Sequence, residues 1–357
     1  MRLRSVLTTA LVVLAAVAGG TLECSRKRAG TPEVQQGRKV YVRMCAVCHG
    51  ENGEGYKADQ ATALRHPDFL ASVTDEFLRQ AITNGRTSTT MSAWGVERGG
   101  PLAKADVNAV IAFVRTWSSG PKAALDERPL TTGAAGAGQT SYARVCARCH
   151  GERGVGGQNV AIGNPQLLAS ASNGYLRYAI GHGRSGTGME GFAATLGDST
   201  IEDILALMRS WQAGSAPPPA FVGKPPPIPL GRVPLHPKGP EPLGFNVHPK
   251  MTSADVIKAQ LDRGARMVVL DARAPSDYMN EHITGAVSVP FYEPEPYFAG
   301  LPKSSWLVCY CGCPHAESGQ LAQKLLANGF TKVTVLDEGL GFWKTKKYGT
   351  HTGVTAD

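Results

Sequence analysis

The residues with the clearest chemical potential form a five-residue pattern, Cys-x-x-Cys-His, which occurs twice, 101 residues apart. Two thiols at this spacing reach the two vinyl groups along one edge of a haem and form thioethers, while the adjacent imidazole ligates the iron. A redox dithiol or half of a zinc site is the alternative, but a glycine follows both histidines, and the repetition favours haem. We therefore predict two covalently bound c-type haems, with thioethers at Cys45, Cys48, Cys146 and Cys149 and iron ligands at His49 and His150.

A sixth iron ligand has to come from a loop on the opposite face of each haem. Met91 is the only methionine between His49 and the second pattern, and it lies in a polar loop without helical periodicity. Met189 occupies the matching place 98 residues later, so we predict Met91 and Met189 as the remaining ligands. His66 and His182 are the rival ligands, and bis-histidine ligation would lower the haem potential relative to His/Met ligation.

The elements that must position these ligands also occur twice. A glycine and a tyrosine precede each first cysteine at one-turn spacing, and an apolar helical pattern closes each repeat, at 107–117 and 201–211. The second closing helix starts with Ser199-x-x-Glu202, a capping box. This plan resembles the class I cytochrome c fold, and two such domains in tandem resemble the dihaem cytochromes c. We predict two all-α domains at 33–118 and 136–213.

The remaining third of the chain has a different character. Half of the 24 prolines fall between residues 214 and 249, which predicts an extended linker. From 250 to 350, apolar runs alternate with helical patterns, which predicts an α/β domain with a largely parallel sheet. The expected fold class is therefore multidomain, with two all-α domains followed by one α/β domain.

This last domain resembles the rhodanese family. The resemblance rests on residues 269–273, Tyr278, residues 282–290, Tyr310-Cys311, Gly329-Phe330, Gly339 and Trp343. It implies that Cys311, directly after the central strand, carries a persulfide, and Cys313 is the candidate resolving thiol. Cys309 is expected to be a core thiol. Glu317 stands in a loop that lacks the arginine common in the family, so we expect anionic thiosulfate to be a poor substrate.

The N-terminus predicts export. Two arginines precede a short apolar run within residues 1–22, as in a signal peptide or an N-terminal anchor, and Cys24 stands where a lipoprotein carries its lipid. The expected location is periplasmic or otherwise extracytoplasmic, with or without a membrane tether. The formal net charge of +8 is not arranged as a nucleic-acid stripe, and it would favour an acidic redox partner.

Three functions are compatible with these features. The first is an exported dihaem electron carrier that binds or oxidises a small sulfur compound at Cys311 and passes the electrons to the haems. The second is a plain electron carrier whose rhodanese-like domain only binds a partner. The third is a sulfurtransferase whose haems sense redox state. If the chain is an enzyme, the expected activity is that of a thiol or persulfide oxidoreductase or of a sulfurtransferase.

Overall fold

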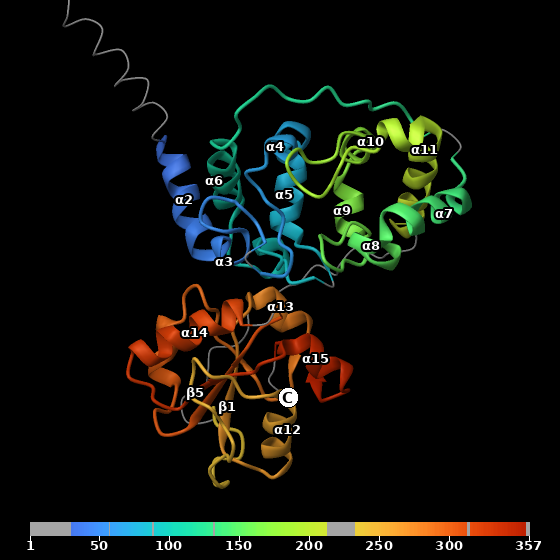
Figure 1. Cartoon of the computed structure of the whole chain (residues 1–357). Helices are drawn as coiled ribbons and strands as arrows, with labels where there is room; N and C mark the ends of the chain where they lie inside the picture. Colours follow the sequence, from blue (N-terminus) through green and yellow to red (C-terminus); the bar gives the residue numbers. More distant parts are fainter. Residues whose placement is uncertain are drawn as a thin grey trace, which may run out of the picture.

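The computed structural model describes residues 30–56, 58–87, 89–130, 133–212, 233–312 and 315–354. The predicted signal segment 1–22, Cys24 and Cys313 lie outside these ranges. Two helical domains lie side by side, and an α/β domain lies below them with its helices α13 and α14 closest to the helical pair (Figure 1). None of the helices in this part of the chain combines the length and the apolar character that a membrane span requires.

The first helical domain is organised by the crossing of its first and last helices, α2 (Pro32–Met44) and α6 (Lys104–Arg115). A Cβ atom at Gly37 would lie 1.9 Å from the carbonyl oxygen of Ala109, so only glycine permits this approach. The first and last helices of this domain therefore cross closely at Gly37. Between the two helices lie α3 (Ala46–His49), α4 (Pro67–Ser72), α5 (Asp75–Asn84) and the 3₁₀ turn η1 (Val96–Arg98).

The second helical domain repeats this plan with α7 (Ala135–Val145) and α11 (Ala193–Gln212). A Cβ atom at Gly138 would lie 2.1 Å from the carbonyl oxygen of Asp203, which reproduces the glycine crossing of the first domain. Gly197, at φ 70°, interrupts α11 near its start. The remaining elements are α8 (Ala147–His150), η2 (Glu152–Gly154), α9 (Pro165–Ser170) and α10 (Asn173–His182).

Glu202 has a role in α11 that the capping-box prediction did not include. Its carboxylate accepts hydrogen bonds from Nε and Nη2 of Arg177 at 2.5 and 2.9 Å. Both side chains are 7% exposed, so this is a buried, bidentate ion pair between α10 and α11. In the first domain, the residue that matches Arg177 is Arg79, which donates to the neutral Asn108 instead.

The two helical domains contact each other through a matched pair of hydrogen bonds. The imidazole Nε2 of His66, which caps α4, lies 3.0 Å from the carbonyl oxygen of Ser185. At an offset of 98 residues, the amide of Asn164, which caps α9, donates to the carbonyl oxygen of Thr87 at 2.7 Å. Each domain therefore binds the methionine-containing loop of the other through a helix cap, in an approximately two-fold arrangement.

The α/β domain contains a four-stranded parallel sheet in the order β3-β1-β4-β5, which confirms the predicted parallel sheet. Asp271 and Tyr310, the last residues of β1 and β4, lie side by side, so the residues that follow both strands meet at one sheet edge. The strands are β1 (Met267–Asp271), β2 (His282–Ile283), β3 (Val287–Ser288), β4 (Trp306–Tyr310), β5 (Val333–Val335) and β6 (Thr350–His351). The helices are α12 (Ala254–Asp262), α13 (Pro275–Asn280), η3 (Glu295–Gly300), α14 (Ala316–Ala327) and α15 (Gly339–Thr345).

The end of the predicted linker contacts this domain. Leu235 forms two backbone hydrogen bonds with Met267 of β1, and the amide of His248 donates to the carbonyl oxygen of Val333 in β5. Val233 is 4% exposed. Residues 233–249 thus pack on the α/β domain, a contact that the proline pattern gave no means to foresee.

Candidate haem sites and the Cys311 loop

Both histidines of the repeated pattern are held in the same way. They end the short helices α3 and α8, and the Nδ1 atoms of His49 and His150 lie 2.9 Å from the carbonyl oxygens of Thr62 and Val160. Because a carbonyl oxygen only accepts, Nδ1 must carry the proton, which leaves the Nε2 lone pair for a metal. Burial also lowers the pKa of His49, which favours the neutral imidazole that ligates iron.

The cysteines of the pattern are available for haem attachment. Cys45, Cys48, Cys146 and Cys149 are partly buried thiols that form no disulfide in the structure. The turn after each histidine is fixed by a tyrosine of the preceding helix: the hydroxyl of Tyr41 donates to Gly50 at 2.7 Å and that of Tyr142 to Gly151 at 2.9 Å.

The two predicted methionine ligands lie in loops of the same construction. The carbonyl oxygens of Met91 and Met189 accept hydrogen bonds from the amides of Arg86 and Arg184, at 2.9 and 2.7 Å. Their own amides are 3.2 and 3.1 Å from the hydroxyls of Thr89 and Thr187. The two methionine loops, 98 residues apart, therefore match in backbone structure as well as in sequence. Met208, in contrast, is 2% exposed in α11 and is a core residue.

The rival ligands have other partners. The Nδ1 atom of His66 accepts from the amide of Asp68 while its Nε2 atom contacts Ser185, so both ring nitrogens are engaged. His182 stacks on Tyr178 with ring centroids 4.7 Å apart, and its Nε2 atom lies 3.5 Å from the Asp68 carboxylate. Each domain supplies the imidazole nitrogen and the paired thiols that a c-type haem requires, with a methionine as the candidate for the remaining ligand, so the residues present fit this cofactor.

Cys311 lies at the carboxyl edge of the parallel sheet. It follows β4 directly, is 1% exposed, and its Sγ atom lies 3.3 Å from Oγ of Ser318 in the first turn of α14. A helix N-terminus favours a bound anion or a thiolate at this place. Cys309 is fully buried within β4, and burial raises its thiol pKa far above the usual range, as expected of a core thiol.

Arg273, a cation close enough to the Cys311 loop to influence Glu317, is already paired. The guanidinium of Arg273 forms a bidentate ion pair with Asp271, with its Nη2 atom 2.6 Å from Oδ2. Glu317 is 4% exposed, and burial raises its pKa well above the usual range. Burial also raises the pKa of Asp277. The Cys311 loop therefore has buried carboxyls where an arginine would attract anions.

A contact that no sequence pattern predicts connects this loop to the first helical domain. A Cβ atom at Gly312 would lie 3.4 Å from Cγ2 of Thr90, the residue before Met91. The hydroxyl of Ser92, the residue after Met91, donates to Oδ2 of Asp277 at 2.5 Å. The predicted sulfur site and the predicted first haem ligand loop are thus direct neighbours, although they are more than 200 residues apart.

Comparison with known proteins agrees with this division. The family model of cbb3-type cytochrome c oxidase subunit III matches residues 32–114 and 133–208, and the rhodanese-like domain model matches residues 253–346. A FixP subunit of cbb3-type cytochrome c oxidase from Azorhizobium caulinodans is 29% identical over 187 residues, which are 50% of this chain and 60% of that protein. A CcoP subunit from Azospirillum brasilense is 27% identical over 195 residues, which are 50% of this chain and 62% of that protein.

The chain therefore spans about three fifths of the length of these curated relatives. Among solved structures, the rhodanese-like domain of an Anabaena protein is 30% identical and covers 29% of this chain and 80% of its own, with a TM-score of 0.27. The repeated haem pattern, its duplicated scaffold and the two family matches agree. The chain is accordingly a dihaem c-type cytochrome, with two cytochrome c domains that each hold one covalently bound haem, fused to a C-terminal rhodanese-like domain.

Proposed function

We propose that this electron carrier oxidises a small sulfur compound at Cys311 and passes the electrons to its own haems. The observation that carries the proposal is the contact between the Cys311 loop and the Met91 loop, at Gly312 and Thr90. Sulfur oxidation needs an electron acceptor, and a haem ligated by Met91 would supply one near the thiol.

Hydrogen sulfide is the substrate that suits the site best. Hydrosulfide and the Cys311 thiolate form one S–S bond and give a persulfide anion, with the release of one proton and two electrons. The haems supply one-electron acceptance at each iron, so the two haems of one chain match the two electrons.

Individual side chains have roles in this step. Ser318 Oγ, 3.3 Å from the sulfur, and the N-terminus of α14 stabilise the negative charge on Cys311 and its persulfide. Glu317, buried in the same turn, adds no positive charge. A thiosulfate dianion would therefore enter without a compensating cation, which makes it a poor substrate.

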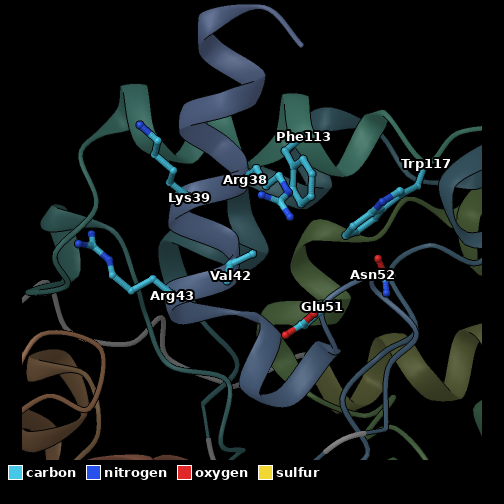
Figure 2. A pocket seen from close by; sticks show the side chains of 8 residues that line it. All are labelled: Arg38, Lys39, Val42, Arg43, Glu51, Asn52, Phe113 and Trp117. Carbon is cyan, nitrogen blue, oxygen red and sulfur yellow. The ribbon is translucent and has the colours of Figure 1, made fainter. Parts of the chain in front are cut away.

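The proposal extends to location and partners. The signal-like segment 1–22 and covalent haem attachment support an extracytoplasmic protein, either free or tethered through Cys24. A groove of about 580 Å³ beside α2 has three cationic side chains, Arg38, Lys39 and Arg43, close to the exposed Val42 (Figure 2). This surface supports docking of an acidic redox protein that exchanges electrons with the cytochrome.

The test is an anaerobic titration of the oxidised holoprotein with sulfide, followed by haem absorbance. We expect reduction of both haems and a Cys311 peptide that is heavier by one sulfur atom. Cys311→Ser should lose both signals but keep normal reduction by dithionite, and Cys309→Ala is the matched control that should keep them. Haem reduction that is unchanged in Cys311→Ser would refute the proposal.

A second candidate function is favoured by the near-complete burial of Cys311, at 1% exposure under the first haem domain. In that case the rhodanese-like domain is a non-catalytic binding module. Sulfide would then neither reduce the haems nor modify Cys311 in the folded protein.

A further inference from the structure

The loops that carry the two methionines share a backbone but have different surroundings. Ser92 follows Met91 and is 2% exposed, whereas the matching residue Glu190 is exposed. The match is structural as well, because the amides of Trp94 and Phe192 donate to equivalent carbonyl oxygens of α5 and α10 at 3.0 Å. The rhodanese-like domain accounts for this difference.

Three consecutive residues after Met91 are held by the rhodanese-like domain. The hydroxyl of Ser92 donates to Asp277 at 2.5 Å, and the hydroxyl of Ser276 donates to the carbonyl oxygen of Ala93 at 2.7 Å. Asp277, the acceptor of the first bond, and Ser276, the donor of the second, both belong to α13. The third contact is between the rings of Trp94 and Tyr292, whose centroids are 5.6 Å apart; Trp94 is 4% exposed.

The second cytochrome domain has no such support. Within the described ranges, no hydrogen bond joins Glu190, Gly191 or Phe192 to another domain. Phe192 is half-buried, and its two neighbours are exposed. In the part of the chain that the structure describes, the Met189 loop is held by its own hydrogen bonds to Arg184 and Thr187 and by the contact of Ser185 with His66 of the first domain, and no hydrogen bond joins it to the rhodanese-like domain.

We propose that α13 of the rhodanese-like domain clamps the axial loop of the first haem, and that Ser92 and Asp277 are positioning residues for Met91. The clamp makes the two haems inequivalent, because each methionine loop contacts the other cytochrome domain but the rhodanese-like domain holds the Met91 loop. A methionine ligand raises the haem potential, so opening the clamp lowers the potential of the first haem alone. This inference does not depend on sulfur chemistry at Cys311.

The test uses the full-length holoprotein with Ser92→Ala or Asp277→Ala. The first readout is the weak long-wavelength absorption of a methionine–ferric iron bond, to which each haem contributes half. We expect loss of up to half of this band, together with a lower midpoint in one of the two potentiometric waves. Ser92→Thr keeps the hydroxyl and should keep the band, and Glu190→Ala, at the matched position of the second domain, is the control without effect.

A second measurement is used if a variant folds or binds its haems incompletely. Imidazole competes with methionine for ferric iron, so Ser92→Ala should bind imidazole more tightly at one site per chain and unchanged at the other. The clamp is overturned if the unmodified protein lacks the methionine band, if both variants keep the full band and both midpoints, or if the two haems change equally. Failure of the sulfide titration would leave each of these readouts unaffected.

Discussion

Replacing Glu202 with glutamine should destabilise the second cytochrome domain and leave the first unchanged. The hydrogen bonds from Arg177 lower the pKa of Glu202 from 4.5 to about 2. A shift of this size corresponds to about 3 kcal/mol of stability at neutral pH. Breaking a buried ion pair costs about 3–5 kcal/mol, and we expect the lower end because Arg177 keeps backbone acceptors at Asp126, Arg128 and Pro129.

Hydrogen exchange read out by mass spectrometry measures this locally. Protection of α11 should fall on the order of 100-fold in Glu202→Gln, since each 1.4 kcal/mol is tenfold. Helix α6 in the same molecule is the internal control, because the residue that matches Glu202 is the neutral Asn108, to which Arg79 donates a hydrogen bond. The folded-state pKa is depressed, so the advantage of the parent protein is complete above about pH 5 and is lost as the pH falls towards about 2. Unchanged protection of α11, or an equal loss in both helices, would refute the reasoning.

Two further experiments test the scaffold and the core. Gly138→Ala should sharply lower the yield of folded holoprotein, because its Cβ atom would lie 2.1 Å from the carbonyl oxygen of Asp203. Gly136→Ala in the same helix is the control, because its Cβ atom would meet nothing within 4 Å, and it should change stability by less than about 1 kcal/mol. Thermal melts of the two variants measure the difference. Cys309 should react with iodoacetamide only in denaturant, which peptide mapping checks, and labelling in the native state at a rate equal to that of an exposed thiol would contradict its assignment as a core residue.

The parts of the structure that could be predicted are those set by local spacing. The haem patterns follow from spacing within one repeat, and the 98-residue match of the methionine loops follows from comparison of the two repeats. The parallel sheet and the place of Cys311 after β4 follow from apolar runs and turn residues in the same way. Each of these depends on residues close in sequence or on comparison of the chain with itself.

The parts that could not be predicted depend on surfaces that meet only after folding. Ser92 and Asp277 are 185 residues apart, and neither belongs to a pattern that would mark it as an interface residue. The capping-box interpretation of Glu202 missed its ion pair because Arg177 lies on another helix, outside any local pattern. Charged and hydroxyl side chains have several possible partners, and tertiary packing decides among them.

The reciprocal contacts between the two cytochrome domains have a consequence for how these domains can move relative to each other. The hydrogen bond of His66 to Ser185 and that of Asn164 to Thr87 join the two domains, and the tilted rings of Phe77 and Tyr175, whose centroids are 5.2 Å apart, form a further contact between them. A rotation of one domain relative to the other would have to break these contacts. The separation of the residues that would hold the two haems is therefore set by these contacts.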